Sequence, residues 1–416
     1  MTSSTLDAEP ACPGAAADSR PVAGTARGSS RGHTSQQLIA VRRPFDSIDR
    51  ETWDSLAASN PWATPFSRWA FHRAWWDAYG ATSHDEMIVV VPAADPSAPL
   101  VAIVPLMHRH EVEPTDAEIR TSLRHASGDA LTPVEPTAKA IFFGASYHAD
   151  YATLLAHPLD LPAVAEALVE LLAGPNREDG PNREDGERWD AVDLRRLRFG
   201  DPTADALLAA FRRRAATEGW CVTDEREDVC PVVTLPENVD YDGYLALLDK
   251  KERHEIRRKV RRAEAAGEVR LDVVADPSTE VDTFIDLHQK RWGADGLFPP
   301  TAGGEASRRF FERLATWSGP DGSLRLTRLT VGGRLVAEGV HFDDGDTLYY
   351  YNAGVDPDAR ELSPGVLMSA RYMDLAMGLG RGRVDFLRGN EPYKYEWGAV
   401  DEPIRRILVT RTQRRA

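Results

Sequence analysis

The stretch whose residue types are best suited to catalysis is DFLRGNEPYKYEWG, residues 385–398. Only six of the 50 basic residues in the chain are lysines, and one of them, Lys394, lies here between two tyrosines. Lysine offers a compact point charge on a flexible stem, whereas arginine is a planar fork. Such a charge can stabilise a developing oxyanion, which predicts a catalytic role for Lys394. The alternative is a lysine that packs its stem between aromatic rings and leaves its ammonium group in water.

A second candidate is the sequence SPG at the start of an expected helix over 363–380. Ser363 occupies the N-cap position and Pro364 the first turn, and the backbone N–H groups of such a helix start suit a phosphate. Gly365 would let a ligand approach closely. We assign Tyr351, on the preceding strand, to the same donor site. The alternative is an ordinarily capped helix.

Glu338 is a third candidate, because it shares a face of an expected strand with Val336, Val340 and Phe342. A carboxylate in this apolar row would be desolvated and have a raised pKa, which suits a general base for an amine. The alternatives are an edge position or a salt bridge to an arginine.

A basic helix is expected at 250–262, where eight Lys or Arg residues stand against Glu252 and Glu255. This surface could dock a phosphate-rich partner such as coenzyme A, a lipid-linked sugar or a tRNA. The alternative is a solvated helix surface with intrahelical ion pairs.

Length and composition limit the classes of protein to which this sequence can belong. A chain of 416 residues predicts two domains, and its net charge of -15 argues against a general nucleic-acid binder. Three cysteines lack metal-type spacing, and His288 and His341 are isolated, so we expect no metal. Apolar runs of membrane-spanning length and a secretion signal are absent from the sequence, so we expect a cytoplasmic protein. Serine-hydrolase, zinc-protease, Walker and dinucleotide motifs are also absent.

The elements that would position these residues follow an α/β (α+β) pattern. We expect a disordered tail at 1–37, an N-terminal domain at 38–235 and a C-terminal domain at 236–416, each a mostly antiparallel sheet flanked by helices. PNREDG occurs twice at 175–186, which predicts a surface loop.

Local patterns give the expected elements within each domain. In the first, helices are expected at 66–80, 161–174 and 201–219, a hairpin at 87–107 and strands at 189–197 and 230–236. In the second, helices are expected at 241–268 (broken near Asp249), 281–296, 305–319 and 363–380, a three-stranded meander at 324–355 and strands at 383–389 and 403–412.

Several ordered motifs from about 240 to 398 resemble a known family. KKERHEIRRKVRRAEAAG, FIDLHQKRWGADG, LTVGGRLVAEGVHFDDGDTLYYYNAGVDP, SPGVLM and FLRGNEPYKYEW look like the GNAT-superfamily acyltransferases called CelD-like, which are related to Fem-type peptidyltransferases. The resemblance implies two tandem GNAT-like domains, with an acyl donor bound at the C-terminal one.

Carried onto this sequence, the resemblance implies that Ser363, Pro364 and Gly365 face the donor phosphates. It places Arg388 and Tyr393 beside Lys394 at the reaction centre, and we assign Arg388 and Glu391 to substrate binding. Arg291 and Trp292 would line the acceptor cleft.

Two departures from the family matter. A long coiled-coil arm, often found in enzymes that use aminoacyl-tRNA, is absent from the sequence, which favours a coenzyme A thioester. Glu338 stands where the family more often has a small or apolar residue, so the family does not support its role as a base.

We therefore expect a cytoplasmic N-acyltransferase that moves an acyl group, in particular acetyl, from acyl-CoA to an amine on a sugar or cell-envelope polysaccharide precursor. The alternatives are an aminoacyl-tRNA-dependent peptidyltransferase acting on a peptidoglycan precursor, and a non-catalytic module that binds a nucleotide-linked sugar. DNA is not an expected partner.

Overall fold

The computed structural model describes residues 37–109, 131–135, 137–145, 147–174 and 189–411. The tail predicted at 1–37, except for its last residue, and the loop predicted at 175–186 lie outside the described residues. No helix in the described ranges is long and apolar enough to cross a membrane.

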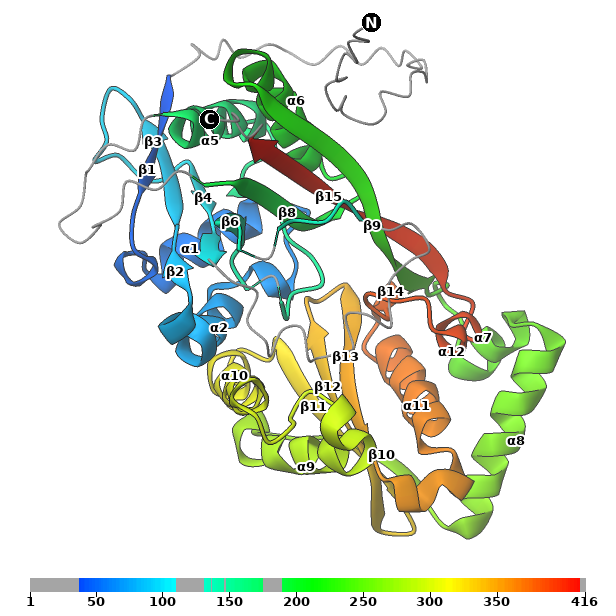
Figure 1. The fold of residues 1–416 in the computed structure, drawn as a ribbon. Helices are drawn as coiled ribbons and strands as arrows, with labels where there is room; N and C mark the ends of the chain where they lie inside the picture. The colour runs from blue at the N-terminus through cyan, green and yellow to red at the C-terminus, as the bar shows by residue number, and fades with distance from the viewer. Residues whose placement is uncertain (1–36, 110–130, 136, 146, 175–188, 412–416) are drawn as a thin grey trace, which may run out of the picture.

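Two sheets, surrounded by helices, make up the molecule (Figure 1). The smaller has the order β1-β3-β4-β7, and the larger has the order β10-β11-β12-β13-β14-β9-β15-β8-β6-β5-β2. Their strands are β1 (Leu38–Arg42), β2 (His84–Asp85), β3 (Ile88–Pro92), β4 (Ala102–Val104), β5 (Leu106–Arg109), β6 (Ala140–Phe143), β7 (Leu155–Ala156), β8 (Ala191–Arg198), β9 (Trp220–Thr234), β10 (Val269–Val273), β11 (Leu324–Val331), β12 (Arg334–Asp343), β13 (Thr347–Val355), β14 (Arg383–Asp385) and β15 (Val400–Arg411).

The helices cover both sheets. They are α1 (Arg50–Ser59), α2 (Trp69–Tyr79), α5 (Leu161–Ala173), α6 (Pro202–Glu218), α7 (Tyr241–Leu247), α8 (Lys250–Ala266), α9 (Val281–Trp292), α10 (Ala302–Ser318), α11 (Pro364–Gly378) and α12 (Pro392–Tyr395). The mixed fold of antiparallel-rich sheets flanked by helices is confirmed.

The two longest strands join the halves of the chain. The last strand, β15, pairs with β9 from Val400↔Val232 to Arg411↔Trp220, and along its other edge it pairs with β8. Both β8 and β9 come from the N-terminal half, so the C-terminal strand completes a sheet begun in the first half (Figure 1). The division at residue 235 therefore follows the chain, while the large sheet runs through both halves. The division itself stays a prediction.

Helices cover both faces of the C-terminal meander. Helices α9 and α10 pack on one face, in the cluster that contains Val340 and Phe342. Helices α8 and α11 pack on the other, in the cluster that contains Leu348 and Tyr350. Each strand therefore has buried side chains on both faces.

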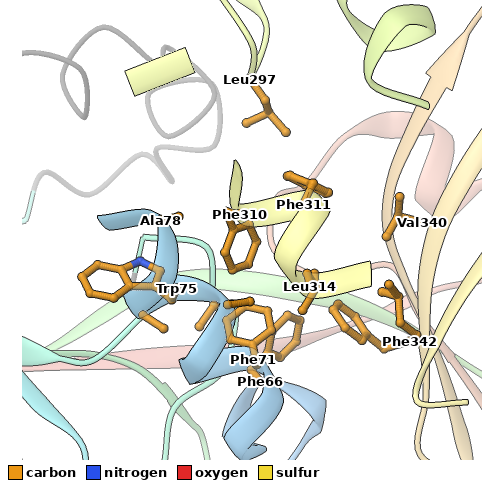
Figure 2. Close-up of a cluster of buried hydrophobic side chains, with 14 of the residues drawn as sticks. Phe66, Phe71, Trp75, Ala78, Leu297, Phe310, Phe311, Leu314, Val340 and Phe342 are labelled. Carbon is orange, nitrogen blue, oxygen red and sulfur yellow. The ribbon is translucent and has the colours of Figure 1, made fainter. Parts of the chain in front are cut away.

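An aromatic core joins the two halves beside α2 and α10 (Figure 2). The rings of Phe71 and Phe310 lie 5.3 Å apart, and those of Phe66 and Phe342 lie 5.4 Å apart, all in edge-on contacts that favour aromatic packing. This core fixes the loop before α2 against the face of β12.

Most expected elements are present with shifted ends. The meander is formed by β11, β12 and β13, and the helix expected at 241–268 breaks at Asp249 into α7 and α8. The strand expected at 230–236 is only the end of β9, which begins at Trp220. That extension is polar and exposed on one side, so it lacks the apolar run that marks its end.

Candidate active site

The candidate site begins where the two parallel strands β13 and β14 stop pairing. Strands β13 and β14 pair only from Thr347↔Arg383 to Tyr349↔Asp385, after which β14 ends and β13 continues to Val355. A bulge at Tyr351 accompanies the separation, since Val340 pairs with Asn352 and His341 with Tyr350. Within the described residues, the backbone of β13 beyond Tyr349 therefore lacks a strand partner on this side and could pair with an extended ligand.

Aromatic side chains line the α11 side of the separation. Tyr350 lies 5.9 Å from Phe386 and 5.3 Å from Tyr372, and Phe386 lies 6.0 Å from Tyr393. Burial raises the pKa of the Tyr393 and Tyr350 hydroxyls, so both stay protonated donors at neutral pH. Tyr393 is partly exposed, at 39%, as a residue that contacts a substrate should be.

The start of α11 has an unusual cap. Ser363 occupies the predicted N-cap position, but it adopts a left-handed conformation with φ 54° and its side chain makes no cap. Its Oγ instead accepts a hydrogen bond of 2.6 Å from Arg262 of α8. Pro364 begins the helix, and a Cβ built on exposed Gly365 would meet nothing within 4 Å. An open helix start beside an arginine suits a phosphate group.

Lys394 has contacts that differ from those of an oxyanion donor. Its Nζ donates to the carbonyl oxygens of Leu387, Arg388 and Gly389, each at 2.9 Å, and lies 3.0 Å from Glu391 Oε2. An ammonium group has three protons, so these acceptors use its full capacity. The side chain is 2% exposed, which also excludes the alternative of a head left in water. Lys394 holds the loop 387–391 in shape.

That loop needs such support, because Leu387 has φ 57° and is not glycine. Arg388 points its Nε toward Asp150 of the N-terminal half, at 3.4 Å. Glu391 contacts Lys394. Arg388 and Glu391 were assigned to substrate binding. In this structure Glu391 instead stabilises the loop through Lys394, and Arg388 lies at the junction of the two halves.

Three other candidates are spread around the site. Tyr351 turns away from α11: its hydroxyl donates to the His148 carbonyl oxygen at 2.9 Å, so its predicted place in the donor site does not follow from this geometry. Arg291 and Trp292 lie at the end of α9, with the guanidinium 4.7 Å from the ring centroid. Arg291 also acts electrostatically on Tyr350 and Tyr393, which places it near the separated strands.

Glu338 is buried beneath α9 and lies opposite Gly354, in the stretch of β13 that has separated from β14. It pairs across the sheet with Arg328 and Gly354, and α9 packs tightly over Gly354. Its carboxyl is 0% exposed, and neither oxygen has a hydrogen-bond partner within the described ranges. Burial raises its pKa to about 8, against the opposing effect of Arg328. Because α9 packs over this part of the sheet, we expect the Glu338 carboxyl to act on stability.

We therefore predict that Glu338→Gln stabilises the protein in a pH-dependent way. The folded pKa lies above the unfolded value of 4.5, so the unfolding free energy of the wild type falls as pH rises from about 4.5 to about 8. Glutamine does not titrate, so the variant does not lose stability in this way. Its free energy of unfolding, relative to that of wild type, should rise by on the order of 2–3 kcal/mol between pH 5 and pH 8. Urea unfolding at both pH values measures it, with exposed Glu305→Gln as the control. An equal effect at the two pH values would contradict the prediction.

The N-terminal half contains a similar parallel pair that its own chain closes. Strands β6 and β8 pair in parallel, and α5 lies between them in sequence. Beyond this pair Ala152 bridges to Leu197, and its N–H donates to the Arg196 carbonyl at 2.9 Å. The space equivalent to the separation of β13 and β14 is therefore filled by residues of the first half, which leaves the C-terminal half as the candidate site.

Sequence reasoning missed two residues of this region. Asp385 was read only as part of a strand, yet its buried carboxyl accepts from Tyr151 Oη and Leu387 N–H, both at 2.7 Å. Arg262 was one of eight basic residues in a helix, and nothing local distinguishes it. Its contact with Ser363 spans 101 residues. The described residues contain no group of three or more His, Cys, Asp or Glu placed to hold a metal ion.

Comparison with known proteins adds a family and a fold. Residues 250–395 match the family model described as an acetyltransferase (GNAT) domain. FemX is similar in structure, with 13% identity, a TM-score of 0.51 and coverage of 86% of this chain and 96% of its own. A protein of unknown function from Bacteroides thetaiotaomicron is also similar, with 13% identity, a TM-score of 0.50 and coverage of 87% and 98%. At such identity the structures show a shared fold. No curated protein matches the sequence.

Proposed function

Because this chain is an acyltransferase of the GNAT superfamily, with its acetyltransferase domain at 250–395, we propose that it transfers an acetyl group from coenzyme A to an amine. The observation that carries the proposal is the parting of β13 and β14 next to the open start of α11. An extended thioester arm could pair with the free edge of β13 beyond Tyr349, while its phosphates lie before Gly365.

The charges near the helix start support a phosphate-bearing donor. Arg262 already donates to Ser363 Oγ, and its guanidinium has further N–H groups that could reach a phosphate. Other basic residues of α8, including Lys259 and Arg258, continue the positive surface along the same helix. This local charge stands out against the net charge of -15 of the whole chain.

The reaction needs an amine nitrogen to attack the thioester carbonyl carbon. A tetrahedral oxyanion forms, the carbon–sulfur bond breaks, and the amine loses a proton. Partly exposed Tyr393 could donate a hydrogen bond to the oxyanion, since its pKa is raised by burial. Lys394 would act indirectly, because it holds the loop that carries Leu387 and Arg388 in shape.

A second donor class is favoured by one observation, the basic surface of α8. Eight Lys and Arg residues between Lys250 and Arg262 could hold the backbone of an aminoacyl-tRNA, the donor expected for a Fem-type peptidyltransferase. The two donors differ in size and salt dependence. We favour coenzyme A, and we propose a cytoplasmic enzyme whose acceptor amine belongs to a sugar or cell-envelope precursor.

A thermal-shift titration separates these donors. Acetyl-CoA, longer acyl-CoAs and free coenzyme A should each raise the unfolding temperature, because a ligand that binds only the folded state stabilises it by mass action. A shift with aminoacyl-tRNA that falls steeply with salt, and none with coenzyme A, would favour the second donor class instead. No shift with any donor would count against an acyltransfer site here.

A further inference from the structure

A polar pocket lies between the two halves, on the face of the large sheet opposite α11. It has a volume of about 430 Å³, within the range of small-molecule sites. The N-terminal half contributes the segment between α1 and α2, with Thr64 and Arg68, and also Arg198 of β8. The C-terminal half contributes the paired ends of β13 and β14, including Tyr349 and Asp385. The pocket therefore ends at the last residue pair before the strands separate.

Three arginines give one part of the pocket a positive charge. The Arg68 side chain is exposed and has no ion pair or hydrogen bond within the part of the chain that the structure describes. Arg198 stacks on Tyr151 at 5.0 Å and makes only a 3.5 Å contact with Glu402, whose other oxygen is held by Arg383 at 2.6 Å. The lining holds three arginines and three aspartates, so its charges balance, and Arg68 is the positive group that is available to an anionic ligand.

Thr64 also lines this pocket. It is 3% exposed and forms a capping box with Ser67, whose hydroxyl oxygen accepts from the Thr64 N–H at 3.2 Å. Asp344 and Asp346 also line the pocket and provide acceptors for hydroxyl or ammonium groups.

Asp385 lies at the inner end of the pocket, next to the strand separation. It is 1% exposed and accepts from Tyr151 Oη and Leu387 N–H. Each carboxylate oxygen has two lone pairs, so both can accept a further hydrogen bond. Figure 1 shows β14 between β13 and β9, with α11 on one side of this sheet.

We propose that this pocket holds the acceptor, an amine that also carries a phosphate or carboxylate, and that Asp385 takes the proton from its nitrogen. The proposal rests on the acyltransfer function proposed above. Arg68 and Arg198 bind the anionic group, Asp344 and Asp346 bind hydroxyl groups, and the amine points past Asp385 toward the thioester. Donor and acceptor approach the separated strands from opposite faces of the sheet.

The proposed step is balanced. The amine nitrogen forms a bond to the thioester carbonyl carbon, and the carbon–sulfur bond breaks to release a thiolate. One proton passes from the nitrogen to the Asp385 carboxylate, the thiolate takes up one proton from water and leaves as coenzyme A, and Asp385 returns its proton to water. The products are an amide and a thiol, and no oxidant or metal is required.

The surroundings of Asp385 fit a base that works near neutral pH. Burial raises its pKa to about 6, against the Tyr151 and Leu387 hydrogen bonds and Arg198, while Glu402 raises it further. Cys230 of β9 and Tyr349 of β13 also face this carboxyl. Because the carboxylate form is needed, kcat/KM should fall below pH of about 6.

Acceptor binding can be tested without the donor. Glucosamine 6-phosphate and glucosaminuronic acid, which carry a phosphate and a carboxylate, should raise the unfolding temperature, and glucosamine, which has no anionic group, should not. Arg68→Ala should weaken this binding at least about tenfold, equivalent to one charged hydrogen bond. Arg212→Ala, an exposed arginine on α6 outside the pocket, should bind like wild type. The better of the two anionic probes identifies the phosphate or the carboxylate as the recognised group.

Coenzyme A binding to the same variants separates the two proposals. Arg68→Ala and Asp385→Asn should retain it, and Asp385→Asn should lose at least about 100-fold in turnover of the bound amine together with the acid limb of the pH profile. If wild type binds coenzyme A but no probe shows anion-dependent binding, or Arg68→Ala binds the probes unchanged, the acceptor proposal is overturned while the donor proposal stands. If the wild-type protein does not bind coenzyme A, the proposed function is rejected instead.

Discussion

Replacing Lys394 by methionine is expected to destabilise the protein by about 3–5 kcal/mol, the range seen when one partner of a buried charged group is removed. The variant leaves the carbonyl groups of Leu387, Arg388 and Gly389 without their common donor. It also leaves Glu391 without its cation. Because Leu387 holds a left-handed conformation, the loop should relax once this donor is gone.

Urea unfolding measures this loss, with Lys290→Met as the matched control. Lys290 contacts two aspartates but is 46% exposed at its side chain, so its removal should destabilise the protein much less than removal of Lys394. Lys394→Met should also weaken coenzyme A binding, since the loop borders the strand separation. Unchanged stability and donor affinity with a loss of at least about 100-fold in kcat would instead support the oxyanion role predicted from the sequence.

Replacing Gly365 by tryptophan is expected to abolish donor binding while leaving the fold intact. The Cβ position at Gly365 is open, so the new side chain can be accommodated, but it would occupy the space before the first turn of α11. Phosphate groups could then no longer approach the helix start. Coenzyme A affinity should fall at least about 100-fold, or roughly 2.7 kcal/mol.

The same helix supplies the control. Gly378, in the last turn of α11, is also exposed and also has nothing within 4 Å of its Cβ position. Calorimetric titration with coenzyme A should give wild-type affinity for Gly378→Trp, and both variants should keep the wild-type unfolding temperature. Equal affinities of Gly365→Trp and wild type would move the donor phosphates away from α11.

Local sequence patterns were sufficient for the elements that frame the site. Glycine-containing turns separate the strands of the β11–β13 meander, and Pro364 marks the start of α11, so neighbours in sequence determine both. The break between α7 and α8 at Asp249 was also visible in the sequence. The order of strands in the large sheet was not, because insertion of β15 between β8 and β9 depends on pairing across about 200 residues.

Side-chain roles were harder to predict than elements. A lysine between tyrosines suggests chemistry, but its partners are carbonyl groups of a turn whose shape the sequence does not reveal. Asp385 has an ordinary place in an alternating strand, and only folding brings Tyr151 and Arg198 to it. The residue types at Ser363–Gly365 were sufficient to predict a donor site there. Arg262, which lies beside it, comes from a helix that is distant in the sequence.

Hydrogen–deuterium exchange of the full chain, with and without saturating coenzyme A, would locate the donor most directly. Amides of 350–355 on β13 and of 365–367 in the first turn of α11 should exchange more slowly in the complex, since a bound ligand would cover or pair with them. The corresponding region of the N-terminal half, 147–156, should not change. Binding without protection of 350–355 and 365–367, or with protection confined to 147–156, would contradict a donor site between β13 and β14.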